Sequence, residues 1–279
     1  MSTTSALPTS ARQSASTSTR RRSAKAYVIA VANQKGGVAK TTTVASVGAA
    51  LAEAGQRVLL VDLDPQACLT FSLGYDPETV EASIHQLLLG EVEIADVIIS
   101  TDDGPDLLPA TIELAMAEQQ LVMRTGREQL LKKALAPALK AYDVVLLDCP
   151  PSLGILTTVA LTAASGVLIP LQCETLSHRG VGQLLDTIHD VRKITNRRLA
   201  VIGVLPTLFD ARTTHSRLVL ERIGADYGID VLEPAIPKSV RFAEAPAAGR
   251  SIMATSASSK GAVAYREVAE RLLELAGSR

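Results

Sequence analysis

One stretch of this sequence decides its fold: Tyr27-Val28-Ile29-Ala30-Val31-Ala32-Asn33-Gln34-Lys35-Gly36-Gly37-Val38-Ala39-Lys40-Thr41-Thr42. Its first six residues are a continuous apolar run, which is typical of a central strand buried on both faces of a parallel sheet. A turn with two adjacent glycines follows, and then a helical pattern over residues 41–54 that ends at Gly55. Strand, glycine-rich turn and helix in this order predict a loop that binds phosphate, because free N–H groups at a helix start attract anions.

Two side chains of this loop fit that chemistry. Lys40 can place a full positive charge near the β- and γ-phosphates of a nucleotide, and the Thr41 hydroxyl can bind Mg²⁺. Both glycines of the general pattern G-x-x-x-x-G-K-[ST] are replaced, by Gln34 and Ala39, so the loop is a variant. A residue with a Cβ atom is strained at positive φ by about 1–2 kcal/mol. We therefore expect a negative φ at Ala39.

Two later strand patterns end in carboxylates. Residues 58–62 end at Asp62, with Asp64 two positions on, and residues 144–148 end at Asp148 before two prolines. The carboxyl ends of parallel strands meet at one edge of a sheet, where ligands bind. Alternation along a strand is expected to direct Asp62 and Asp64 to the same side. These carboxylates are therefore candidates for binding metal and water beside the phosphate loop.

The rest of the chain repeats the alternation of strand and helix. This pattern indicates βαβ units with right-handed crossovers. It predicts an α/β fold, doubly wound, with a mostly parallel sheet and helices on both faces. No linker interrupts the pattern, so residues 26–279 are expected to form one domain. The expected strands are 27–32, 58–62, 107–109, 144–148, 166–170 and 199–204, and the expected helices are 41–54, 83–89, 113–122, 127–139, 155–164, 180–194, 217–227 and 262–275.

Composition argues against several classes of protein. Hydrophobic residues make up 47% and charged residues 20%, which suits a globular chain with a large aliphatic core. Cys68, Cys149 and Cys173 are scattered and form no CxxC pair, so disulfides, a zinc site and an iron–sulfur cluster are not expected. No run approaches the roughly 18 consecutive apolar residues of a membrane-spanning helix.

The N-terminal segment differs from the rest in charge. Residues 1–25 contain five basic residues and no acid, whereas the remainder has 23 basic against 29 acidic residues. The segment is rich in Ser, Thr and Arg, so we expect a disordered extension. Its positive charge suits contact with DNA phosphates, although a tail that is merely solvated is an alternative. Its composition also resembles that of an organellar transit peptide.

The loop at Asn33–Thr42 resembles the deviant Walker A motif of the ParA/MinD ATPases and is closest to that of chromosomal ParA/Soj proteins. The resemblance implies that Lys35 reaches across an ATP sandwich dimer to the partner's nucleotide. Asp62-Leu63-Asp64-Pro65-Gln66 resembles the family's DxDPQ segment, which implies that Asp64 orients the attacking water. Asp148-Cys149-Pro150-Pro151 resembles its Walker B strand and diproline switch.

Segments 203–213 and 236–246 are also similar to ParA. With them, the resemblance implies four sets of functional residues. The catalytic residues are Lys35, Lys40 and Asp64, and the Mg²⁺ ligands are Thr41, Asp62 and Asp148. Arg212 and Arg241 contact DNA without regard to sequence. ATP is bound by Lys35, Gly36, Gly37, Val38, Ala39, Lys40, Thr41, Thr42, Thr207, Asp210 and Pro237.

The function implied is that of a cytoplasmic, nucleoid-associated ATPase that uses ATP and Mg²⁺. It forms a homodimer on ATP, binds non-specific DNA, and hydrolyses ATP slowly unless a ParB-like protein stimulates it. One alternative is a ParA-like regulator in which the nucleotide acts mainly as a switch. A MinD-like protein on membranes is disfavoured, because residues 265–275 carry three glutamates against two arginines and no Phe or Trp.

Overall fold

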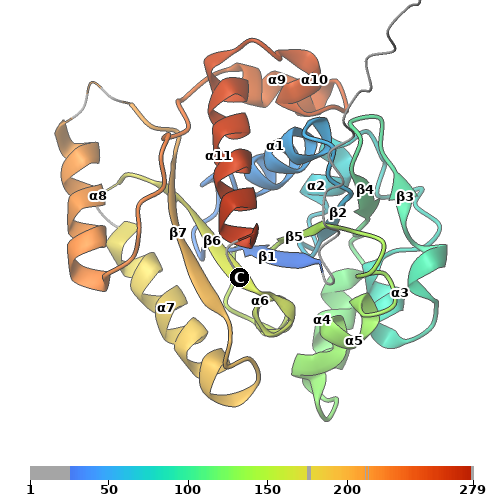
Figure 1. Ribbon diagram of the computed structural model, residues 1–279. Helices are drawn as coiled ribbons and strands as arrows, with labels where there is room; N and C mark the ends of the chain where they lie inside the picture. The colour runs from blue at the N-terminus through green and yellow to red at the C-terminus, as the bar shows by residue number, and fades with distance from the viewer. Residues whose placement is uncertain (1–25, 175–176, 211, 213, 278–279) are drawn as a thin grey trace, which may run out of the picture.

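A seven-stranded sheet organises the chain (Figure 1). The computed structural model describes residues 26–174, 177–210, 212 and 214–277, so the predictions for residues 1–25 lie outside the described range. The strand order is β3-β4-β2-β5-β1-β6-β7, and all neighbours are parallel except β3 and β4. The predicted fold class is confirmed. The strands are β1 (Tyr27–Val31), β2 (Val58–Asp62), β3 (Ile99–Ser100), β4 (Asp106–Leu108), β5 (Val144–Asp148), β6 (Gly166–Gln172) and β7 (Ala200–Thr207).

The central strands have no face toward water. Every residue of β1, β2 and β5 is buried. Along β1, Val28 and Ala30 pack into one core, and Ile29 and Val31 pack into the other. This is why the strands are continuous apolar runs: with helices on both faces, neither set of alternating side chains reaches solvent.

The helices form two layers (Figure 1). One face of the sheet is covered by α1 (Lys40–Glu53), α2 (Cys68–Ser72), α9 (Arg241–Ala247), α10 (Ile252–Thr255) and α11 (Lys260–Gly277). The other is covered by α3 (Ile84–Leu89), α4 (Leu114–Val122), α5 (Leu130–Leu135), α6 (Ile155–Ala163) and α7 (Ser177–Ile194), with α8 (Thr214–Tyr227) against α7. Within the described part of the chain, no helix has the length and hydrophobicity to cross a membrane.

Helix α11 packs on the domain, against α1. Tyr265, Val268 and Leu272 are buried in the core that α11 shares with α1. The Tyr265 hydroxyl lies 3.0 Å from the Thr43 hydroxyl of α1. The C-terminal helix therefore braces the helix that follows the phosphate loop.

The order of the strands positions the site. β1 lies between β5 and β6. After β1 the chain forms β2, β4 and β5 on one side of it, and it then crosses to form β6 and β7 on the other side. In doubly wound sheets, ligands bind in the crevice at this point, outside the carboxyl ends of the strands. The loop after β1 occupies that position.

Short elements escaped the sequence analysis. The helix predicted over 127–139 is a 3-10 turn, Arg127–Gln129, followed by α5, which ends at Leu135. Pro137 explains the early end, because proline has no backbone N–H to continue the helical hydrogen bonds. Strand β3 and helices α2, α9 and α10 have only two to seven residues, too few for a periodic pattern.

Candidate nucleotide and magnesium site

The phosphate loop connects β1 to α1 at the carboxyl edge of the sheet. Gly36 and Gly37 are exposed at its tip, whereas Val38 and Lys40 are buried. Gly37 has a φ of 74°, which glycine adopts without strain. The exposed glycine backbone beside the free N-terminus of α1 is suited to close approach by phosphate oxygens.

The expectation of a negative φ at Ala39 is wrong. Ala39 has φ 63° and ψ 35°, and its carbonyl accepts the first hydrogen bond of α1, from the Thr43 N–H at 2.9 Å. The loop must therefore turn into the helix within this one residue, and that requirement outweighs the strain of its Cβ atom. Two other described non-glycine residues have positive φ, Ala67 before α2 and Leu208 after β7, both at this same edge.

Replacing Ala39 by glycine is expected to raise the free energy of unfolding by about 0.5–1 kcal/mol, because the left-handed strain exceeds the added entropy of the unfolded chain. Nucleotide affinity should stay within about threefold, since backbone N–H groups bind the phosphates in both variants. Denaturant unfolding and titration with a fluorescent nucleotide measure the two effects. Ala52→Gly, within α1, is the control and should lose about 1 kcal/mol. A less stable Ala39→Gly variant would show that the strain argument fails.

Two side chains hold the loop from distant strands. Asn33 donates from Nδ2 to the Pro170 carbonyl of β6 at 2.7 Å and accepts the Lys35 N–H at 3.0 Å. The Thr207 hydroxyl, buried at the end of β7, donates to the Val38 carbonyl at 3.0 Å. Thr207 therefore supports the loop in this structure, and its direct contact with nucleotide stays a prediction. The supporting role of Asn33 was missed, although Asn33 opens the motif in the sequence.

The two lysines of the loop point to different places. Lys40 is buried, and its Nζ lies 3.3 Å from the Lys35 carbonyl, so its ammonium group folds back over the loop. The Lys35 Nζ pairs with the Glu174 carboxylate at 2.5 Å, and both side chains are partly exposed. The Lys40 ammonium therefore stays over the loop of its own chain, whereas the Lys35 side chain is directed to the surface beyond β6.

Two buried carboxylates lie side by side beneath the loop. Asp62 and Asp148 are register partners on β2 and β5, and Asp148 is level with Val31 on β1. Asp62 accepts hydrogen bonds from the Thr70 N–H and hydroxyl, at 2.9 and 2.8 Å, and from the Asp64 N–H at 3.1 Å. Burial raises the pKa of Asp62 to about 6, although the Thr70 hydrogen bonds act against this. Asp62 therefore supports α2 and the turn, and its contact with a metal remains a prediction.

Asp148 has no such donors. Neither carboxylate oxygen accepts a hydrogen bond of normal geometry from the described residues. Burial and then the charge of Asp62 raise its pKa well above the usual range, while the nearby Thr41 hydroxyl and Lys40 ammonium lower it. A buried, unpartnered carboxylate costs free energy unless a cation or donor satisfies it. Asp148 and Thr41 therefore fit a cation.

The surroundings favour Mg²⁺ shared with a phosphate. The described residues contain no group of three His, Cys, Asp or Glu side chains able to hold a metal. Mg²⁺ commonly takes one or two protein oxygens and completes its shell with water and phosphate oxygens. The site has this character, and the geometry is suited to a nucleotide–Mg²⁺ pair.

Asp64 lies in the turn after β2. Its Oδ1 accepts the Gln66 N–H at 3.0 Å and its carbonyl accepts the Ala67 N–H at 2.8 Å. Because β2 ends at Asp62, strand alternation does not decide where Asp64 points. Asp64 is half-buried at the same edge as the loop, and its role with water stays a prediction.

The remaining predicted residues belong to the part of the chain that follows β7. Asp210 binds both the Nε and Nη2 atoms of Arg212, at 2.9 and 2.8 Å, and this lowers the pKa of Asp210 to about 2. Pro237 bridges to Phe209, next to Asp210. Arg212 and Arg241 are 89% and 58% exposed, and Arg241 pairs with Glu244 at 3.0 Å. Both arginines are therefore accessible, and each is paired with a neighbouring carboxylate.

Comparison with known proteins identifies the family. Residues 26–201 match a family of AAA domains. The sporulation initiation inhibitor protein Soj of Bacillus subtilis is 44% identical over 246 residues, which are 88% of this chain and 97% of Soj. The chain belongs to the ParA/Soj family of chromosome-partitioning ATPases. The chromosome partitioning protein ParA of Caulobacter vibrioides is 40% identical over 88% of this chain and 93% of its own length.

Among solved structures, this ParA/Soj chain is similar to one from Mycobacterium smegmatis described as cobyrinic acid a,c-diamide synthase. It is 58% identical, with a TM-score of 0.80, over 89% of this chain and 94% of the other. That protein has been seen with an ATP analogue and magnesium, and also with ADP and magnesium. These structures agree with the nucleotide-binding character of the family.

Proposed function

We propose that this ParA/Soj protein forms an ATP sandwich dimer, binds DNA non-specifically, and hydrolyses ATP when a ParB-like partner stimulates it. The observation that carries the nucleotide part is Asp148: a buried carboxylate that accepts no hydrogen bond of normal geometry from the described residues, close to Lys40 and Thr41, at the switch point of the sheet. Lys35, directed away from the chain's own loop, supports the dimer. The exposed Arg212 and Arg241 support the DNA contact.

In this proposal, each side chain of the site has one task. The backbone of Gly36 and Gly37 and the Lys40 ammonium hold the phosphates, and a bound Mg²⁺ supplies charge that stabilises them during transfer. Asp64, at the half-buried turn, orients a water molecule for in-line attack on the γ-phosphate. The protein contributes mainly position and charge, because the transition state needs little covalent help.

Replacing Asp148 by asparagine is expected to stabilise the metal-free protein and remove its response to Mg²⁺. Because burial raises the pKa of Asp148 well above 3.8, the folded protein binds this proton more readily, and the contribution of Asp148 to stability falls as pH rises above 3.8. At pH 7.5 the substitution should raise the free energy of unfolding by on the order of 2 kcal/mol. Thermal unfolding with and without Mg²⁺ and nucleotide measures this.

Asp143→Asn is the contrasting control. Asp143 is paired with Arg57 at 2.8 Å, so the same chemical change should lower stability. The gain for Asp148→Asn should also shrink as the pH is lowered, because the raised pKa lets the wild-type Asp148 carboxylate take up a proton. An Asp148→Asn variant that is less stable at pH 7.5 without Mg²⁺ contradicts the account of the site.

Arg212→Glu and Arg241→Glu are expected to weaken DNA binding in the ATP state at least about tenfold each, because each change replaces a cation on a phosphate-contacting surface. ATP affinity should not change. Arg271→Glu is a matched control, because Arg271 is 60% exposed and pairs with Glu274 three residues on, as Arg241 pairs with Glu244. Fluorescence anisotropy with two unrelated duplexes at several salt concentrations tests the surface. If Arg271→Glu weakens binding as much as the other two, the assigned DNA surface is wrong.

A ParA-like regulator remains the second candidate for this site, since a nucleotide-dependent dimer serves a switch equally well. ATP turnover separates the two. The proposal expects slow basal hydrolysis that DNA and a ParB-like protein increase together. Hydrolysis that stays negligible under all these conditions favours the regulator.

The name of the Mycobacterium smegmatis relative indicates a third reaction, formation of an amide from an acid. Such a reaction needs a nitrogen donor, and release of ammonia from glutamine uses an activated cysteine. Burial raises the pKa of the Cys149 thiol, and that of Cys173 to about 11, and burial beside Asp64 raises that of Cys68. Burial thus disfavours the thiolate form at all three cysteines, whereas such a nucleophile has a lowered pKa. Incubation with ATP, cobyrinic acid and either glutamine or ammonium tests this directly.

A further inference from the structure

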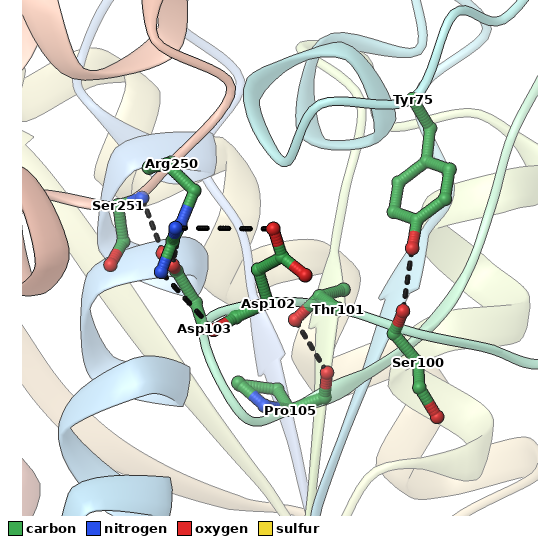
Figure 2. Close-up of polar contacts among 8 residues, drawn as sticks. All are labelled: Tyr75, Ser100, Thr101, Asp102, Asp103, Pro105, Arg250 and Ser251. Atoms are coloured by element: carbon green, nitrogen blue, oxygen red, sulfur yellow. Dashed lines mark hydrogen bonds and ion pairs between the residues drawn. The ribbon is translucent and has the colours of Figure 1, made fainter.

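The loop that follows helix α9, which carries Arg241, is attached to the domain through an ion pair between Arg250 and the buried, sequence-distant Asp103 (Figure 2). The Asp103 side chain is only 2% exposed and accepts hydrogen bonds from the Arg250 Nε and the Ser251 N–H. Arg250 also donates from Nη2 to the Asp102 carbonyl at 3.1 Å. These contacts join the loop between α9 and α10 to the turn between β3 and β4.

That turn is itself held in place. The Thr101 hydroxyl donates to the Pro105 carbonyl at 2.7 Å, and the Tyr75 hydroxyl donates to the Ser100 carbonyl at 2.5 Å (Figure 2). At Gly104, where φ is 97°, a Cβ atom would lie 3.1 Å from the Ala52 Cβ of α1. The turn therefore rests on the C-terminal end of the phosphate-loop helix and offers Arg250 a fixed partner.

A second contact joins the same loop to the segment after α2. A Cβ atom added to Gly249 would lie 2.8 Å from the Gly74 Cα, and one added to Gly74 would lie 3.1 Å from the Gly249 carbonyl. The two backbones thus touch directly. Helix α2 begins just after Asp64, and its Thr70 donates two hydrogen bonds to Asp62. The segment from Asp62 to Gly74 therefore connects the carboxylates of the nucleotide site to the loop at the C-terminal end of α9.

We propose that Arg250 and Asp103 are positioning residues. Their ion pair holds the α9–α10 loop against Gly74, so that the position of Arg241 on α9 depends on the conformation of the segment that joins Gly74 to the nucleotide site. Without the ion pair, the sequence and charge of α9 are unchanged, but the contact that fixes the position of α9 on the domain is lost. The proposal rests on the DNA contact proposed for Arg241. It adds the device by which DNA binding depends on the state of the segment around Asp62 and Asp64.

The chemistry makes the two partners unequal. Arg250 is 38% exposed and can turn to water when Asp103 is changed, whereas Asp103 is buried and is left uncompensated when Arg250 is removed. Asp103→Asn retains the size of the side chain and an oxygen acceptor for the Ser251 N–H. It is therefore the milder variant for separating positioning from a failure to fold.

The test compares full-length Arg250→Ala, Arg250→Lys and Asp103→Asn with Arg266→Ala. Arg266 is the matched control, since it pairs with Glu53 at 2.7 Å between α11 and α1 and does not touch α9. Hydrogen exchange of the amides of residues 241–249 reports how firmly α9 is held on the domain. DNA affinity in the presence of ATP or ADP reports the effect on DNA binding. A fluorescent nucleotide reports the site itself, and thermal unfolding reports stability.

We expect Arg250→Ala and Asp103→Asn to speed exchange in 241–249 and to weaken DNA binding with ATP about five- to tenfold, because α9 must then be ordered on binding. The ratio of the DNA affinities in ATP and ADP should fall by the same factor, nucleotide affinity should stay within about twofold, and Arg250→Lys should restore part of the loss. Exchange and DNA affinity that match those of Arg266→Ala, whatever the change in unfolding temperature, overturn the proposal. If Arg241→Glu leaves DNA binding intact, the DNA surface is wrong, and the exchange data alone decide whether the ion pair positions α9.

Discussion

Lys40→Ala is expected to abolish nucleotide binding, with ATP and ADP affinity falling roughly 100-fold or more, as when one partner of a buried charge pair is removed. The Lys40 side chain is buried and lies over the loop backbone, and its positive charge lowers the pKa of Asp148, opposing the effect of burial. Its removal leaves the phosphates without their nearest cation and leaves Asp148 less compensated. Titration with a fluorescent nucleotide in the presence of Mg²⁺ measures the loss, and circular dichroism confirms that the variant is folded.

Lys35→Ala is the matched control, because Lys35 lies in the same loop but pairs with Glu174 at its surface. It should bind ATP nearly as well as the wild type while losing the ATP-dependent dimer, which light scattering after size exclusion reports. Nucleotide affinity of Lys40→Ala within about fivefold of the wild type would contradict the placement of the phosphates over this loop. Equal loss of nucleotide by both variants would contradict the division of labour between the two lysines.

The second large effect is expected for Asp64→Ala, which should reduce stimulated ATP hydrolysis about 100- to 1000-fold and leave the protein as an ATP-bound dimer. Asp64 is half-buried, and its side chain accepts a hydrogen bond from the Gln66 N–H, whereas the buried Asp62 accepts three hydrogen bonds from Thr70 and Asp64. Without it, water is no longer oriented toward the γ-phosphate, whereas the groups that hold the nucleotide are unchanged. Release of phosphate and the amount of dimer, followed together over time, give both readouts.

Asp76→Ala controls for the loss of a turn. Asp76 accepts the Glu78 N–H on its Oδ1 at 3.0 Å, as Asp64 accepts the Gln66 N–H at 3.0 Å, and the carbonyl of each residue closes the same kind of turn. Asp76→Ala should therefore hydrolyse ATP at the wild-type rate. If Asp64→Ala hydrolyses ATP normally, or if its dimer dissociates as fast as the wild type's, the role assigned to Asp64 is wrong.

The sequence predicted the frame of the site well. The strands ending at Asp62 and Asp148 begin and end where the apolar runs do, because a strand buried on both faces must be apolar throughout. The loop residues Lys35–Ala39 lie between β1 and α1, and Lys40–Thr42 form the first turn of α1. Short elements were missed, because two to seven residues carry too little periodicity.

The site also held features that no local pattern contains. Thr207 and Val38 are 169 residues apart in sequence, and Arg250 and Asp103 are 147 apart, yet both pairs are joined by hydrogen bonds. The positive φ of Ala39 is likewise set by the path from β1 into α1, against the preference of the residue itself.

What the sequence determined by itself is the chemistry available: a phosphate loop with two lysines, three strand ends at one edge, and carboxylates near them. What the tertiary structure decided is the use of each group. Asp62 and Asp148 look alike in sequence, but among the described residues Asp62 accepts three hydrogen bonds and Asp148 accepts none of normal geometry. The physical reason is that hydrogen bonding and burial depend on neighbours brought by other strands, and these forces act through space, not along the chain.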